Sequence, residues 1–144
     1  MNTINPSNSD QNIIILNQKN RGIGAARNLG LNKCTSKFVA FLDSDDVWEN
    51  NKIFFCYNIL KNENIDLIYH DEFRVKNNVK KIIEYGEIPE PKFNSLLLLG
   101  NNLSPSSVIV KLSLLKRINF FSEDLKYNSA EDYDLWLNLA SKDF

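Results

Sequence analysis

The sequence predicts an α/β fold. Apolar runs of strand length alternate along the chain with amphipathic segments of helix length, and this alternation is typical of α/β domains. One apolar run leads directly into an acidic cluster, a pattern typical of a strand that ends at the ligand-binding edge of such a sheet. The 144 residues suffice for one domain with a buried core, and a content of 43% hydrophobic and 24% charged residues is that of an ordinary globular protein.

The first half of the chain is expected to hold three strands and two helices. Residues 1–12 are polar and are expected to form a tail, so the domain spans residues 13–144. Continuous apolar runs predict strands buried on both faces, and helix formers or spaced apolar residues predict helices. The expected elements are a strand at 13–16, a helix from Gly24 that ends before Thr35, a strand at 38–42, a helix from Asn50 or Asn51 to about Lys61, and a strand at 65–69.

The second half begins with polar and apolar residues mixed over positions 71–85, which resemble exposed antiparallel strands. Pro89 and Pro91 then break the chain. Beyond them we expect a helix at 93–99, a buried strand at 107–110, a short helix at 112–118 and a final amphipathic helix whose apolar positions include Tyr133, Trp136, Leu137 and Ala140.

Charge and composition exclude several classes of protein. The 17 basic and 18 acidic residues give a net charge of -1, without the cationic excess of a nucleic-acid-binding protein, so no nucleic-acid partner is expected. The longest aliphatic runs are about four residues, whereas a membrane span needs about twenty, so no transmembrane segment is expected. Without a signal-peptide pattern the expected location is the cytoplasm, with the inner membrane surface as an alternative place.

The acidic cluster Asp43-Ser44-Asp45-Asp46 follows the strand expected at 38–42. In an extended chain Asp43 and Asp45 point the same way, so their carboxylates would converge just beyond the sheet. Such oxygen ligands suit Mg²⁺ or Mn²⁺. The alternative is that these residues cap the next helix or solvate a loop.

Two further segments carry groups that could take part in chemistry. Ser129 to Asp132 has the spacing of a capping box before the last helix, and one of its carboxylates could instead serve as a general base. The turn at Gly22 to Gly24 lacks the third glycine of a dinucleotide fingerprint and the Gly-Lys-Ser/Thr of a P-loop. Arg21 and Arg27 flank the start of the helix that follows, where they could meet phosphates.

Four segments taken in order resemble the signatures of family 2 inverting glycosyltransferases of GT-A fold. They are Asn20–Gly30, Phe41–Trp48, Asn101–Ser107 and Glu131–Leu137. The resemblance implies a partial GT-A fold, a Rossmann-like three-layer arrangement with a mixed, mostly parallel sheet. It also implies transfer of a sugar, with inversion, from a nucleotide-diphospho-sugar donor to the hydroxyl of a glycan acceptor.

The resemblance further implies roles for individual residues. Asp45 and Asp43 match the metal-binding DxD pair, with Asp45 the more direct ligand of Mg²⁺ or Mn²⁺. Asp132 is the first choice for the catalytic base and Glu131 the second. The residues implied on the donor side are Arg27, Arg21, Asp43 and Asp46.

The sequence departs from the family pattern at both ends. The family's domain opens with a strand, a turn, a helix and a second strand, and none of these is found before the run at 13–16. The sequence also stops inside or just after the helix that carries the base. We therefore expect a central portion of the catalytic domain that lacks the first two strands and the C-terminal portion. The gap left by the missing strands would close by direct pairing of the strand at 13–16 with the strand at 38–42, in a homodimer, or by a separately encoded fragment.

Two other functions fit parts of the sequence. One is an inactive remnant of such an enzyme. The other is a phosphohydrolase with an aspartyl nucleophile, because an apolar strand that runs into Asp43-Ser44-Asp45 also fits that class. A phosphohydrolase needs a second acidic motif at the end of another strand, whereas Glu131 and Asp132 are expected to open a helix.

Overall fold

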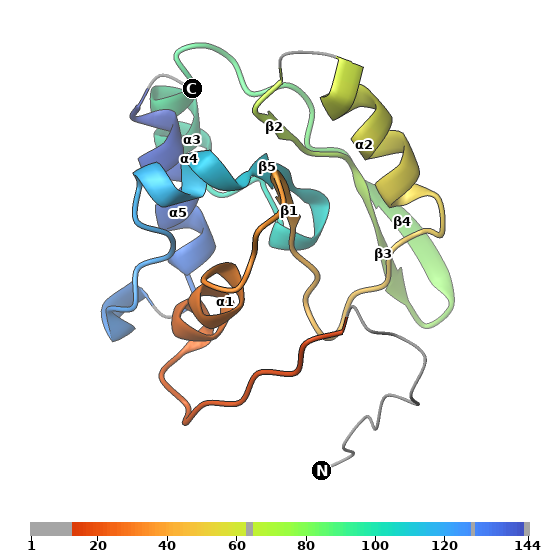
Figure 1. The fold of residues 1–144 in the computed structure, drawn as a ribbon. Helices are drawn as coiled ribbons and strands as arrows, with labels where there is room; N and C mark the ends of the chain where they lie inside the picture. Colours follow the sequence, from red (N-terminus) through yellow and green to blue (C-terminus); the bar gives the residue numbers. More distant parts are fainter. Residues whose placement is uncertain (1–12, 63–64, 128, 143–144) are drawn as a thin grey trace.

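The computed structural model describes residues 13–62, 65–127 and 129–142, which form an α/β domain (Figure 1). Its helices are α1 (Ile23–Leu31), α2 (Lys52–Asn62), α3 (Lys92–Leu99), α4 (Leu112–Arg117) and α5 (Glu131–Ala140). Its strands are β1 (Phe38–Ala40), β2 (Leu67–Ile68), β3 (Glu72–Lys76), β4 (Val79–Ile83) and β5 (Ile109–Lys111). Two short 3-10 helices, η1 (Pro105–Ser107) and η2 (Leu125–Tyr127), complete the described elements.

The larger sheet has three strands in the order β1-β5-β2. The central strand β5 runs antiparallel to both neighbours, with Val110 opposite Val39 on one side and opposite Leu67 on the other. The expectation of a mostly parallel sheet is therefore wrong for the described residues. Strands β1 and β2 do run in the same direction, but β5 lies between them, so they form no parallel pair with each other.

Helices cover both faces of this sheet. The core consists of two clusters of buried hydrophobic residues, one on each face of the sheet. Because side chains alternate along a strand, Val39 and Val110 belong to one cluster and Ile109 belongs to the other. The first face packs against α4 and α5, where Leu115 and Leu135 are fully buried. The second face packs against α2 through Cys56 and Leu60. Figure 1 shows α3, α4 and α5 on one side of the sheet and α2 on the other.

The strand expected at residues 13–16 is absent. This segment has no regular secondary structure, and Ile13, Ile14 and Ile15 are 57%, 69% and 56% exposed. A strand requires a hydrogen-bonded neighbour, and within the described residues β1 pairs with β5 alone. The apolar pattern therefore indicates a segment that favours burial, but the described chain supplies no partner for it.

The remaining elements confirm the sequence expectations to within a few residues. The mixed segment at 71–85 forms the antiparallel hairpin β3–β4. Asn77 and Asn78 at its tip have φ values of 51° and 63°, the left-handed conformation that tight hairpin turns require. Among the described residues, no helix is both long and apolar enough to cross a membrane.

Candidate functional site

The acidic cluster lies just beyond the carboxyl end of β1. Its chain is not extended: the Asp46 amide donates to the Asp43 carbonyl oxygen at 3.1 Å, which closes a turn at Ser44 and Asp45. The condition of an extended chain, under which Asp43 and Asp45 would point the same way, is therefore not met. Asp43 is half-buried, whereas Asp45 and Asp46 are exposed on the turn.

Arg27 joins the acidic cluster to the start of α5. Helix α1 carries this residue, and its Nη2 donates to Asp43 Oδ1 at 2.7 Å while its Nη1 donates to Glu131 Oε1 at 2.8 Å. The side chains of Arg27 and Glu131 are only 13% and 7% exposed, and the guanidinium lies 5.3 Å from the centroid of the Phe121 ring. One buried cation thus holds two acidic motifs that lie far apart in the sequence.

Glu131 and Asp132 occupy different environments in the first turn of α5. Glu131 is buried, and within the described residues its second oxygen, Oε2, is buried without a hydrogen-bond partner. Asp132 is half-buried, and its Oδ2 accepts a hydrogen bond from Asn101 Nδ2 at 3.1 Å. Asp132 is therefore the more accessible carboxylate of the pair.

The capping box expected at the start of α5 does not form. The N-cap residue is Ala130, and no side chain caps the helix. Ser129 has a φ of 70°, which lies outside the extended region that an N-cap residue usually adopts. Instead, Asp132 Oδ1 accepts a hydrogen bond from the Tyr133 amide at 2.7 Å.

Ser106, in η1, holds the acidic turn in place. It is 2% exposed, and its hydroxyl accepts a hydrogen bond from the Asp43 amide at 3.0 Å. Its carbonyl oxygen accepts from Trp48 Nε1 at 3.0 Å and from the Lys52 ammonium, which lies 4.3 Å from the Trp48 ring centroid. Burial lowers the pKa of Lys52, although negative charge on Cys56, Glu72 and Asp46 opposes this shift.

No role was expected for Ser106, Trp48 or Lys52. Ser106 and Trp48 do lie within segments that carry the family resemblance. The resemblance could have marked these two residues as candidates, but it does not predict that they contact each other. Lys52 had no such signal, because a lysine at the start of a helix is normally exposed.

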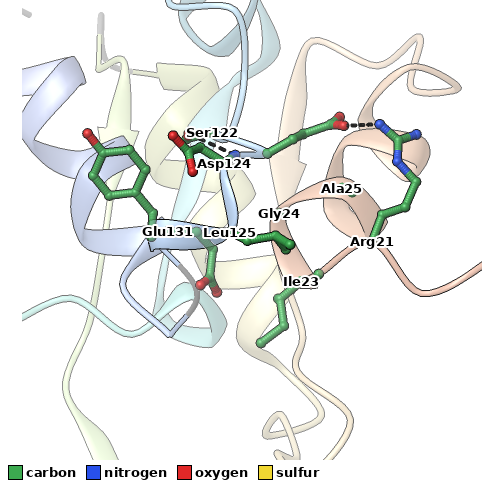
Figure 2. A pocket seen from close by; sticks show the side chains of 11 residues that line it. Arg21, Ile23, Gly24, Ala25, Ser122, Asp124, Leu125 and Glu131 are labelled. Carbon is green, nitrogen blue, oxygen red and sulfur yellow. Dashed lines mark hydrogen bonds and ion pairs between the residues drawn. The ribbon is translucent and has the colours of Figure 1, made fainter.

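Arg21 lies apart from the buried ion pairs. Its Nη2 is 2.5 Å from Glu123 Oε2, and the two side chains are 64% and 38% exposed. Figure 2 shows this pair beside a small pocket between the start of α1 and the segment at 122–127. Glu131 also lines this pocket, so the structure brings Arg21 and Glu131 to one hollow.

The donor set at the acidic turn fits a divalent cation held partly by substrate. No three histidine, cysteine or acidic side chains form a metal-binding group in the described part of the chain. The Asp45 carboxylate is exposed and makes no ion pair among these residues, and Arg27 engages only Oδ1 of Asp43. One or two carboxylate ligands, with other positions left for phosphates and water, is the arrangement that Mg²⁺ usually adopts.

Comparisons with known proteins define the class to which this fold and site belong. A family model described as glycosyl transferase family 2 matches residues 3–117, most of the sequence. The chain belongs to this family. The resemblance drawn from the four sequence signatures is thereby confirmed.

Curated relatives extend the match toward the last helix. The chain is 32% identical over 139 residues to an Escherichia coli UDP-Glc:alpha-D-GlcNAc-diphosphoundecaprenol beta-1,3-glucosyltransferase, an alignment that covers 96% of this chain and 53% of the relative. It is also 32% identical over 126 residues to an E. coli UDP-Gal:alpha-D-GlcNAc-diphosphoundecaprenol beta-1,3-galactosyltransferase, covering 83% of this chain and 43% of the relative.

A third relative is an uncharacterised glycosyltransferase from Rickettsia conorii, 32% identical over 142 residues, which cover 92% of this chain and 22% of the relative. The chain therefore spans about half, or less, of the length of these curated relatives. No solved structure matches.

Proposed function

We propose that the protein transfers a sugar from a nucleotide-diphospho-sugar to an acceptor hydroxyl, with inversion at the anomeric carbon. The observation that carries this proposal is the double ion pair of Arg27, which keeps Asp43 and Glu131 on either side of one guanidinium. A single displacement needs donor-binding groups and a base on opposite sides of one sugar. We infer that the acidic turn supplies the donor-binding groups and that the first turn of α5, next to Glu131, supplies the base.

The relatives suggest the substrates. The two E. coli enzymes are named for UDP-glucose and UDP-galactose donors and for an acceptor carried on diphosphoundecaprenol. We infer a UDP-hexose donor and a lipid-linked sugar acceptor for this protein. A lipid-linked acceptor would bring the protein to a membrane. Because the nucleotide-sugar donor would come from the cytoplasm, the place of action would be the cytoplasmic face of the inner membrane.

Asp132 is proposed as the catalytic base. Its carboxylate would take the proton of the acceptor hydroxyl as that oxygen bonds to the anomeric carbon and the bond to the nucleotide diphosphate breaks. Glu131 is less suited to this role, because Arg27 occupies one of its oxygens and its side chain is 7% exposed. We propose Glu131 as a positioning residue that fixes Arg27.

Asp45 and Asp43 would hold Mg²⁺ or Mn²⁺ at the acidic turn. When bound, such an ion supplies Lewis-acid stabilisation of the departing diphosphate. Arg27 orients Asp43 through their ion pair. Arg21 and Asp46 are both exposed, and we propose that they contact the donor.

Donor titrations and turnover measurements separate these roles. We expect Asp45→Ala to abolish metal-dependent binding of the UDP-sugar. Asp132→Asn should leave donor affinity nearly unchanged and lower turnover by roughly 100-fold or more, as expected for loss of a general base. The matched control is Glu84→Gln, because Glu84 is an exposed acidic residue that directly follows β4. This change should alter neither donor affinity nor turnover.

Equal losses of donor affinity in the Asp45 and Asp132 variants would contradict the division of roles. Absence of both donor binding and transfer in the unsubstituted protein would instead favour an inactive relative of the enzymes. The phosphohydrolase alternative gains no support from the structure, because Glu131 and Asp132 lie in the first turn of a helix rather than at the end of a strand.

A further inference from the structure

The hairpin β3–β4 is a two-stranded ribbon with two different faces. The pairs Phe73 with Ile82 and Val75 with Lys80 lie on one face, because neighbouring pairs along a ribbon alternate between faces. The pairs Glu72 with Ile83, Arg74 with Lys81 and Lys76 with Val79 lie on the other. The ribbon therefore has a mostly apolar face and a second face that carries three of its four basic side chains.

The basic side chains of the ribbon take no part in the ion pairs formed among the described residues. Arg74 and Lys81 stand directly opposite each other, and like charges in this position destabilise a strand pair. Residues 72–83 contain four basic side chains and one acidic one, within a chain whose net charge is -1. The ribbon is thus suited to a negatively charged surface.

The apolar face is open to solvent. Phe73, Val75 and Ile82 are 53%, 59% and 50% exposed. The Lys80 ammonium lies 5.3 Å from the Phe73 ring centroid, so this lysine combines apolar contact with a cation–π interaction. Apolar side chains flanked by lysines that can reach away from them are typical of segments at the boundary between lipid headgroups and acyl chains.

We propose that this ribbon docks the protein on an anionic membrane surface. The apolar face enters the headgroup boundary, and the basic side chains meet lipid phosphates at its level. Charge complementarity selects this partner, since four basic residues on one short hairpin match the negative surface of a membrane with anionic lipids. The inference rests on the proposed function only in that a lipid-linked acceptor requires a membrane nearby.

The base of the ribbon is tied to the catalytic region. Glu72, the first residue of β3, accepts hydrogen bonds from Ser104 Oγ at 3.2 Å and from the Tyr85 hydroxyl. Ser104 immediately precedes η1, where Ser106 holds the Asp43 amide. Figure 1 shows the ribbon projecting from the side of the domain away from α3, α4 and α5. Docking through the ribbon would therefore fix the acidic turn relative to the lipid surface.

Vesicle sedimentation tests this inference without any nucleotide-sugar. The protein should bind vesicles that contain phosphatidylglycerol and bind phosphatidylcholine vesicles much less, with binding that weakens as salt increases. The combined change Arg74→Gln, Lys76→Gln, Lys80→Gln and Lys81→Gln should weaken binding to the anionic vesicles by at least about tenfold. The control replaces Lys19, Lys33, Lys61 and Lys116 by glutamine, which removes the same charge from exposed sites elsewhere and should have a much smaller effect.

A second variant tests the apolar face. Phe73→Ser with Ile82→Ser should weaken vesicle binding severalfold but leave binding to polyglutamate-coated beads unchanged. Equal vesicle binding by the ribbon and control charge variants would overturn the proposal. So would bead binding as strong as vesicle binding, because the partner would then be an acidic macromolecule. Titration of the same preparations with UDP-sugar keeps this result separate from a failure of the proposed function.

Discussion

The Arg27 guanidinium is the residue on which the site depends most. It is nearly buried and bonded to two carboxylates from different elements. A buried charge in such a network is costly to leave unpaired, because neither water nor another cation replaces the lost partner. Removal of the arginine would leave Glu131 buried with both oxygens unsatisfied.

We expect Arg27→Ala to lower the free energy of unfolding by about 3 kcal/mol. The matched control is Arg21→Ala, because Arg21 also pairs with a glutamate but at an exposed site. Its loss should cost less than about 0.5 kcal/mol. Urea denaturation of the three proteins measures both differences, and equal costs would show that the Arg27 pairs contribute no more than a surface ion pair.

The sequence reveals Arg27 as a candidate but not its partners. Its place near the start of a helix after a glycine turn is a local signal, read from adjacent residues. Its bond to Glu131 spans 104 positions, and no local pattern reports such a separation. The same limit applies to Ser106, whose contacts with Asp43 and Trp48 span 63 and 58 positions.

Helix α1 must approach a neighbouring backbone closely, and Gly24 makes this possible. A Cβ atom added at Gly24 would lie 2.4 Å from the Ser122 carbonyl oxygen, which belongs to the main chain and cannot turn away. At Gly30, in the last turn of the same helix, an added Cβ meets nothing within 4 Å. The two glycines therefore differ in the space beside them.

We expect Gly24→Ala to destabilise the protein by about 1 to 3 kcal/mol, since the helix must shift from the 122–127 segment. Gly30→Ala should stabilise it by about 0.5 to 1 kcal/mol, because alanine loses less backbone entropy in a helix. Thermal melts of both variants provide the comparison. A Gly24→Ala melt at or above that of the unsubstituted protein would contradict the close approach.

The anchor of the hairpin predicts a pH dependence. Burial, together with the hydrogen bond to the Glu72 carboxylate and its negative charge, raises the pKa of Tyr85 well above its ordinary value of 10.0. Above pH 10 the unfolded chain therefore loses a proton that the folded chain retains. The free energy of unfolding consequently falls as the pH rises from about 10.

Tyr85→Phe should reduce this alkaline loss by up to about 1 kcal/mol per pH unit. The control is Tyr57→Phe, because the Tyr57 side chain is 55% exposed and its loss should leave the alkaline slope unchanged. Urea denaturation at pH 9, 10 and 11 gives the slopes. Parallel slopes for Tyr85→Phe and the unsubstituted protein would contradict the assigned shift.

Elements were easier to predict than their pairing. Helix α1 follows from its helix-forming residues, α5 from apolar spacing and the hairpin from mixed polar and apolar residues, which are local properties of the chain. The direction of β5 relative to β1 and β2 depends on how η1 leads the chain into the space between these two strands. An apolar run carries no information about that direction. The segment at 13–16 has the pattern of a strand, but a strand forms only where a partner is present.

The described molecule leaves much apolar surface exposed. Twenty large hydrophobic side chains are exposed within the described residues, against eighteen buried hydrophobic residues that form the core. Contiguous exposed apolar surface favours association. Such residues follow one another directly at three places in the described chain: the segment at 13–15, the start of α2 at 53–55 and the end of α3 at 97–99.

We expect the 144-residue chain to self-associate with increasing concentration through the segment at 13–16. Ile14→Lys should shift the association to higher concentration and change the thermal midpoint by less than about 2 °C, because Ile14 is 69% exposed and contributes little to the core. Leu125→Lys is the matched control, because Leu125 is also 69% exposed but has no exposed large hydrophobic residue next to it in the sequence, and it should leave the association unchanged. Sedimentation velocity over a concentration series would contradict the expectation if Ile14→Lys associated as the unsubstituted chain does.

The carbonyl oxygen of Ser106 has a consequence for mutagenesis. It receives donors from Trp48 and Lys52, and so links the start of α2 to η1 through a main-chain atom. Every side-chain replacement at position 106 retains this atom, so Ser106→Ala removes only the hydroxyl contact with the Asp43 amide. An alanine scan would therefore report only the loss of the hydroxyl contact, and only a deletion or a proline that moves the backbone would reveal how much of the molecule position 106 connects.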